Sequence, residues 1–360
     1  MADYTIEKIR RTDRRANRQL DALLEQEGIK RDRNLEYTAG IFDEEYRLIA
    51  TGSCFANTLR CLAVDGAHQG EGLLGQIITH LTEYQYARGN TSLFLYTKCD
   101  KAKYFADLGY YEVARAEGRV VFMENHRNGF SSYLEKLKQE TDVQGGSKIA
   151  IGKQDDSRIG AVVLNANPFT LGHQHLIRQA ASQVDLLHVF VVSEEASLVP
   201  FLVRYRLVKE GAAQFTNLVF HQTGSYLISN ATFPSYFLKD EDTVIASHAR
   251  LDTAVFVRIA DALGIGCRYV GEEPFSHVTA IYNQTMKEEL LGAGIGLFVI
   301  PRLEKEGLAV SASHVRQLIH DQRIEQIRPL VPESTYRYFN SEEAAEVIER
   351  IRQAQRVIHD

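Results

Sequence analysis

The 360-residue chain has only four cysteines, Cys54, Cys61, Cys99 and Cys267, and none of them forms a C-x-x-C pair. The sequence therefore lacks a disulfide framework and the paired thiols of common zinc and redox sites. Its first twenty residues contain no apolar stretch of the kind that a secretory signal needs. No run approaches the ~18 apolar residues of a membrane span. These absences favour a cytoplasmic protein with free thiols.

The chain also lacks an excess of positive charge. It has 41 Lys and Arg against 47 Asp and Glu, a net charge of −6. This balance argues against a nucleic-acid or anionic-membrane surface covering the whole protein, although a local basic pocket for phosphates remains compatible with it. There is no internal repeat and no low-complexity tract. The length suits two domains.

A polar, glycine-containing stretch at residues 140–148, ETDVQGGSK, separates two differently patterned regions. Residues 1–142 are expected to form a mixed α+β domain. Residues 149–340 alternate continuous apolar runs with helical patterns, which is typical of a parallel sheet covered on both faces. Residues 341–360 are expected to form an amphipathic helix that packs on this second domain. The fold class is thus α/β.

The stretch LNANPFTLGHQHLIRQA, residues 164–180, follows the first strand of this predicted parallel sheet and opens a helix. Gly172 permits close approach of the backbone to a ligand. The amides and the positive dipole end of a helix N-terminus favour an anion. His173, in the first turn, can direct its ring at the same anion, and Thr170 offers a hydroxyl. The turn is therefore a predicted phosphate site.

A second stretch, VSASHVRQLI at residues 310–319, again follows a predicted strand and opens a helix. Ser311 is a favourable N-cap. Ser313 and Arg316 lie in the first turns, and a guanidinium holds phosphates through paired donors. Since both stretches follow strands of one parallel sheet, they are expected at the same edge.

T-x-G-H followed about 140 residues later by V-S-x-S-x-x-R resembles the signatures of the nucleotidyltransferase superfamily, [HT]-x-G-H and I-S-x-T-x-x-R. The resemblance implies ATP bound with Mg²⁺, with His173 at the α-phosphate and Thr170 also on phosphate. It implies Arg316 and the Ser311–Ser313 amides on the β,γ side. The residues expected at ATP besides these are Asn167, Pro168, Phe169, Gly172 and Val310. No protein ligands are assigned to a metal.

In the first region, HQGEGLLGQIITHL resembles the acyl-CoA-binding loop of GNAT acetyltransferases, [QR]-x-x-G-x-[GA]. Gln69 and Gly72 match, whereas Leu74 stands at the small-residue position. Gln69, Gly70 and Gly72 are therefore expected to bind a CoA-like arm. A plain strand-turn-helix glycine cluster is the competing interpretation.

A GNAT-like domain joined to a T-x-G-H domain resembles the citrate lyase ligase family, as do the stretches ISNATFPSYFLKD and RYVGEEPFSHVTAIYN. The family converts acetate and ATP to acetyl-AMP and pyrophosphate. It then transfers the acetyl group to the thiol of the phosphoribosyl-dephospho-CoA group on the acyl carrier subunit of citrate lyase. The resemblance implies the same substrates, partner and reaction here.

An acetate pocket is expected around the aromatic stretch 226–240, with Phe233 and Tyr236, and with a cation from Arg204 or Arg206. A hydrophobic cap over the sheet is an equal alternative for the aromatics. Glu272-Glu273 after a strand suits either Mg²⁺ coordination or solvent exposure.

Two rival functions stay open. An adenylyltransferase of CoA or NAD biosynthesis would share both phosphate motifs, but the additional first domain counts against it. A GNAT-type protein acetyltransferase with a nucleotide-sensing second domain would need the small residue that Leu74 replaces.

Overall fold

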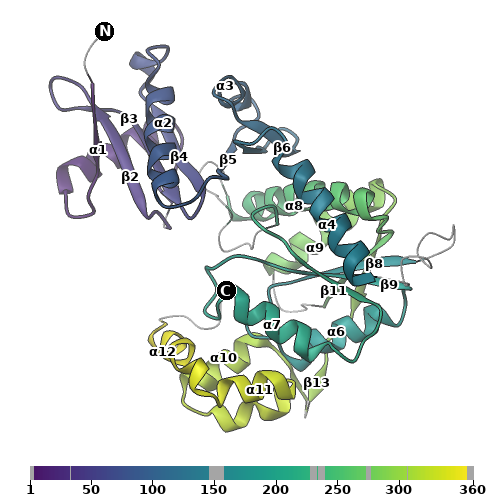
Figure 1. The fold of residues 1–360 in the computed structure, drawn as a ribbon. Helices are drawn as coiled ribbons and strands as arrows, with labels where there is room; N and C mark the ends of the chain where they lie inside the picture. Colours follow the sequence, from purple (N-terminus) through teal and green to yellow (C-terminus); the bar gives the residue numbers. More distant parts are fainter. Residues whose placement is uncertain are drawn as a thin grey trace. The chain divides into compact units, whose positions relative to one another are not determined.

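The computed structural model describes residues 4–32, 34–145, 158–227, 233, 240–272, 277–305 and 307–354. The chain divides into two compact units, Met1–Ser131 with Phe233–Ala254, and Ser132–Thr232 with Val255–Asp360. Each unit has its own sheet (Figure 1). Within the described ranges, no helix combines the length and apolar character needed to cross a bilayer.

The first unit is built on a seven-stranded mixed sheet in the order β1-β2-β3-β4-β5-β7-β6. Its elements are β1 (Thr5–Lys8), α1 (Arg14–Gln26), β2 (Tyr37–Phe42), β3 (Leu48–Phe55), β4 (Thr58–Val64), α2 (Leu73–Ala87), β5 (Phe94–Thr97), α3 (Ala102–Asp107), β6 (Tyr111–Ala116) and β7 (Val120–Glu124). Every strand pair is antiparallel except β4 with β5.

The local sequence explains these elements. Asp13 caps α1 by accepting hydrogen bonds from the Arg15 and Ala16 amides, and the apolar stripe of this helix packs into the sheet through Leu20 and Leu24. After α3 the chain forms a hairpin, β6–β7, because Gly118 adopts a positive φ of 68° and turns the chain.

The second unit contains a five-stranded, wholly parallel sheet in the order β10-β9-β8-β11-β12. Its elements are most of α4 (Gly129–Gly145), β8 (Ile159–Leu164), α6 (Leu171–Ala181), β9 (Leu186–Val191), α7 (Phe201–Gly211), β10 (Leu218–Gln222), the end of α8 (Glu241–Leu263), β11 (Cys267–Gly271), α9 (His277–Gly292), β12 (Gly296–Ile300), the hairpin β13 (Glu304–Lys305) and β14 (Leu308–Ala309), α10 (Ala312–His320), α11 (Glu333–Phe339) and α12 (Ala345–Gln353). Helix α8 belongs to the first unit as far as Ala254. The predicted α/β class is confirmed.

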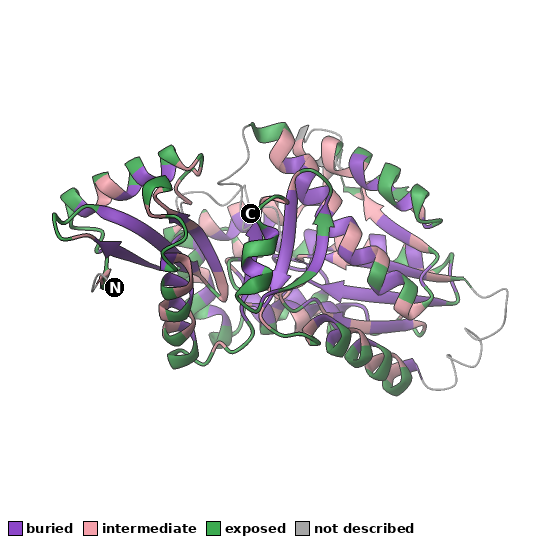
Figure 2. Ribbon diagram, turned by 90° about the horizontal axis from the view of Figure 1, so that it is seen from above, coloured by how far each residue is buried: buried purple, intermediate pink, exposed green. Residues whose placement is uncertain are grey.

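Strand β8 lies at the centre of this sheet, and the chain leaves it in one direction for β9 and β10 before returning to its other side for β11 and β12. Val162 and Val189 have no exposed surface. Buried residues predominate along the strands (Figure 2), as expected for strands covered on both faces. The strand order therefore reverses beside β8. In open parallel sheets, ligands bind at the carboxyl ends of the strands at such a switch point.

The polar stretch at residues 140–148 is helical as far as Gly145, where α4 ends, and residues 146–157 lie outside the described part. The helix belongs to the second unit because Gln144 forms two hydrogen bonds with the main chain of Phe220 in the edge strand β10. The expected C-terminal helix is α12. It packs into the core of this unit through Val347 and Ile351.

Candidate active site

The turn after β8 fixes the position of an imidazole. Thr170 is the N-cap of α6, and its Oγ1 accepts a hydrogen bond from the His173 amide at 3.4 Å. In return, the Thr170 amide donates to Nδ1 of His173 at 3.1 Å. This is a capping box in which histidine replaces the usual Glu or Gln. The ring also stacks on Phe169, with centroids 5.8 Å apart.

These contacts determine the protonation state of His173. Nδ1 accepts a hydrogen bond from a main-chain amide, so the neutral ring must have its proton on Nε2. Burial, followed by the positive charge of Arg316, lowers the pKa of the half-buried His173 to about 4. At neutral pH, His173 is thus an uncharged side chain whose Nε2–H is available to donate a hydrogen bond.

Nuclear magnetic resonance of the imidazole nitrogens tests this state. We expect His173 to titrate near pH 4, with the Nε2–H tautomer above that pH. Arg316→Met should raise this pKa, because it removes a nearby positive charge. The unfolded chain takes up the proton first, so acidification from about 6.5 to about 4 should lower the free energy of unfolding. A titration near 6.5 would contradict this assignment.

The two phosphate motifs meet at Gly172. A Cβ built on this glycine would lie 2.7 Å from the main-chain oxygen of Val310, closer than any real contact of that kind. Arg316 adds a second link, because its Nη1 donates to the main-chain oxygen of Asn167 at 2.5 Å. Residues about 140 positions apart are thereby held side by side, as the motif pairing predicted.

The second motif repeats the construction of the first. Ser311 is the N-cap of α10, as predicted, and its Oγ accepts a hydrogen bond from the His314 amide at 3.1 Å. Arg316 is only 2% exposed, and its Nη2 lies 3.4 Å from Oγ of Ser313. The beginnings of α6 and α10 thus meet at the carboxyl edge of the sheet. Together they provide helix N-terminal amides, a fixed cation and a neutral donor, a combination that suits a polyphosphate.

Three other residues expected at ATP, Asn167, Pro168 and Phe169, fix the conformation of the turn that precedes α6. The Asn167–Pro168 peptide bond is cis, and Oδ1 of Asn167 accepts a hydrogen bond from the Val199 amide at 3.0 Å. Phe169 has no exposed surface. It packs against Gly211, where a Cβ would lie 2.5 Å from its ring. Phe169 therefore orients the His173 ring and offers no surface to a ligand.

Arg204 and Arg206, the two cations considered for an acetate pocket, lie in different surroundings. Arg204 is fully buried and donates to the main-chain oxygens of Val199, Asn165, Val192 and Glu194. Burial lowers the pKa of its guanidinium to about 10. Arg206 is exposed and pairs with Glu343 at 2.8 Å. Arg204 thus binds together the loops after β8 and β9, a task that its sequence neighbourhood does not reveal.

The aromatic stretch is only partly described. Phe233 is buried in the first unit against Tyr96 and His248, with ring centroids 5.8 and 4.6 Å away. Tyr236 lies outside the described residues, as does Glu273. Glu272 is exposed at the end of β11. Within the described ranges, no three His, Cys, Asp or Glu side chains gather as a metal site would require.

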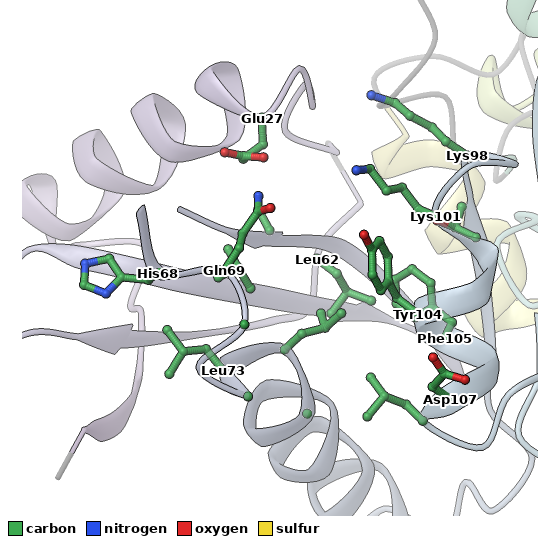
Figure 3. A pocket seen from close by; sticks show the side chains of 18 of the residues that line it. Glu27, Leu62, His68, Gln69, Leu73, Lys98, Lys101, Tyr104, Phe105 and Asp107 are labelled. Carbon is green, nitrogen blue, oxygen red and sulfur yellow. The ribbon is translucent and has the colours of Figure 1, made fainter. Parts of the chain in front are cut away.

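The glycine turn of the first unit borders a pocket of about 850 Å³ (Figure 3). Strands β4 and β5 pair only at Thr58–Phe94 and Leu59–Leu95, and the pocket opens where they are no longer paired. Among its lining residues are Gln69, Gly70, Gly72, Leu74, Lys98 and Lys101.

Gly72 begins α2 with a φ of 79°, and no side chain among the described residues caps the helix there. The first amides of α2 are therefore available to an anion. Lys98 and Lys101 line the same pocket, on the side across from His68 and Leu73 (Figure 3). The sequence analysis missed both lysines, although their place directly after strand β5 was a usable signal.

The comparisons with known proteins agree with this arrangement. A family model described as the citrate lyase ligase C-terminal domain matches residues 159–339. The [citrate [pro-3S]-lyase] ligase of Klebsiella pneumoniae is 39% identical, covering 88% of this chain and 90% of that protein. The enzyme of the same name from Escherichia coli K12 is 34% identical, covering 93% of both.

Two solved structures resemble parts of the chain at low overall similarity. A putative acyl-CoA N-acyltransferase from Klebsiella pneumoniae covers 34% of this chain and 97% of its own, at 20% identity and a TM-score of 0.29. A putative nicotinate-nucleotide adenylyltransferase from Vibrio parahaemolyticus covers 55% and 97%, at 14% identity and a TM-score of 0.36. With relatives at 34–39% identity along about nine-tenths of its length, the chain belongs to the citrate lyase ligase family.

Proposed function

We propose that this protein activates citrate lyase by acetylating the thiol of the phosphoribosyl-dephospho-CoA group on its acyl carrier subunit. ATP and acetate first give acetyl-AMP and pyrophosphate. The observation that carries the proposal is the meeting of the two phosphate motifs, in which Val310 lies against Gly172 and Arg316 bonds to Asn167. Membership of the citrate lyase ligase family favours this reaction over both rival functions.

In the first step, an acetate oxygen attacks the α-phosphorus, and pyrophosphate leaves with the electron pair of the broken P–O bond. The protein's task is to position the reactants and stabilise charge, because no covalent nucleophile is needed. His173 donates from Nε2 to an α-phosphate oxygen. Arg316 and the amides at Ser311–Ser313 stabilise the departing β,γ charge. Mg²⁺ would enter as part of the ATP substrate and would neutralise negative charge on its phosphates.

In the second step, the acceptor thiol attacks the carbonyl carbon of acetyl-AMP. A C–S bond forms, the C–O bond of the anhydride breaks, AMP leaves with the electron pair, and the thiol proton passes to solvent. The pocket beside Gly72 is the proposed binding site of the CoA-like arm. Amides at the start of α2 hold its diphosphate, and Lys98 and Lys101 add positive charge.

This reaction suits a reducing compartment, since the acceptor is a free thiol. The four cysteines of the chain are all free as well. We propose that the protein works in the cytoplasm.

Gly72→Val tests the arm site. Valine is strained at a φ of 79°, and it would add bulk to a residue that lines the arm pocket. We expect the KM for the carrier subunit to rise roughly tenfold while acetate-dependent pyrophosphate release keeps its rate. Gly89→Val is the matched control, because Gly89 follows the other end of α2 with a φ of 84° and lies outside the pocket. Equal KM values for the two variants would remove the arm from this pocket.

The proposed function itself is tested by incubating the protein with ATP, Mg²⁺, acetate and deacetylated carrier subunit. Mass spectrometry should then find an acetyl group on the prosthetic thiol. Omitting acetate or alkylating the thiol beforehand should abolish the product. Transfer of an adenylyl group to a phosphopantetheine compound, with no acetylation of the carrier, would instead favour cofactor biosynthesis.

A further inference from the structure

A second pocket of the first unit, of about 900 Å³, is lined by many cations. Lys8 ends strand β1, Arg10 and Arg11 follow it, and Arg31 comes from the segment before β2. Lys8, Arg10 and Arg11 are exposed. The pocket lies at the β1 edge of the sheet, whereas β4 and β5, which border the arm pocket, are interior strands.

The carboxylates of this pocket are neutralised by cations outside its lining. Asp32 pairs with the buried Arg60 at 2.6 Å, and Glu36 pairs with Arg88 at 2.9 Å. Arg31 is itself paired with Asp21, at 3.3 Å. Within the described part of the chain, Lys8, Arg10 and Arg11 form no ion pair. The pocket therefore keeps an excess of positive charge.

The positive charge continues out of the pocket along helix α1. Arg14, Arg15 and Arg18 are exposed on its first turns. Residues 8–18 thus hold six cations and one carboxylate, Asp13, in a chain whose net charge is −6. The Asp13 carboxylate is engaged by the α1 amides. We call these six cations, Lys8, Arg10, Arg11, Arg14, Arg15 and Arg18, the basic stripe.

We infer that the basic stripe is the docking surface for an acidic face of the protein that bears the acceptor thiol. The inference rests on the proposed function, which requires a protein-borne acceptor. The stripe covers a pocket mouth and a helix face, more surface than one small anion occupies. Opposite charge on two protein surfaces increases the association rate and selects the partner.

The stripe and the arm pocket are linked through one segment. Glu27 and Ile29 line the arm pocket, and Arg31 and Asp32 line the basic pocket. A partner held on the stripe therefore lies next to the segment that borders the arm pocket. Such docking would present the tethered arm to its binding site.

The test is the affinity of the deacetylated carrier subunit for the triple variant R10E/R14E/R18E. We expect the Kd to rise roughly 10- to 100-fold at low ionic strength, and the salt dependence of wild-type binding to disappear. The control K103E/R127E/K287E makes the same change of net charge at exposed positions elsewhere. It should bind the carrier as the wild type does. Acetylation of a free dephospho-CoA thiol should be unchanged in both variants.

Three results would overturn the inference: an unchanged Kd in the stripe variant, an equal loss in the control, or loss of binding to inorganic phosphate or RNA while the carrier still binds. A failure of the proposed function is distinguishable. It would appear as no acetylation by the wild type of either the carrier or the free thiol, whereas the binding measurement would still report on docking.

Discussion

His173→Ala should reduce acetate-dependent pyrophosphate release by about 10²- to 10³-fold, the loss typical of removing one preorganised donor from a developing oxyanion. The side chain is held by Thr170 and Phe169 so that only Nε2 is available to a ligand. Single-turnover measurements with saturating ATP and acetate would separate this effect from product release.

His175→Ala is the matched control for that variant. His175 is an imidazole on the same helix, two residues further on. It should retain activity within about threefold of the wild type.

The pH profile separates hydrogen-bond donation from acid–base catalysis. With the pKa of His173 near 4, the rate should show no histidine-type change between about pH 5.5 and 8. Equal losses in the two variants, or an inflection near 6.5, would contradict the assigned role.

Arg316→Met should reduce the same reaction by about 10²- to 10³-fold and destabilise the fold. The guanidinium is buried beside the main-chain oxygen of Asn167, which would lose a charged hydrogen-bond donor worth about 2–3 kcal/mol. The T-x-G-H turn would then lose one of its two links to α10. Pyrophosphate release measures the loss of rate, and chemical denaturation measures the loss of stability.

Arg316→Lys and Arg323→Met complete that experiment. Lysine keeps the charge but cannot reproduce the fork of donors, so we expect an intermediate rate. Arg323 is an exposed arginine just after α10, and its replacement should change neither stability nor rate appreciably. If Arg316→Met were destabilised but fully active, Arg316 would hold the fold together without contributing to catalysis.

The sequence was most informative where a local signal coincides with the site. Gly172 between a strand and a helix, and Ser311 before a helix, are readable from their neighbours alone, and the structure has α6 and α10 beginning where expected. The approach of Val310 to Gly172 could be inferred only from the pairing of two motifs. The capping role of His173 was not anticipated, because Glu or Gln is the usual residue there.

Long-range contacts explain what could not be predicted. Arg204 has the sequence pattern of a helix-surface cation, yet the acceptors that bury it come from loops up to 39 positions away. Strands β4 and β5 separate beyond Leu59 and create the arm pocket, and no property of either strand alone indicates this. The basic stripe is visible in the sequence, but its excess charge depends on which carboxylates are already paired.

The central claim is that the joined motifs adenylate a carboxylate. The most direct measurement is acetate-dependent exchange of labelled pyrophosphate into ATP by the full chain with Mg²⁺, without any thiol acceptor. The account predicts exchange that requires acetate and disappears in His173→Ala. Exchange that ignores acetate but requires a phosphopantetheine compound would contradict it.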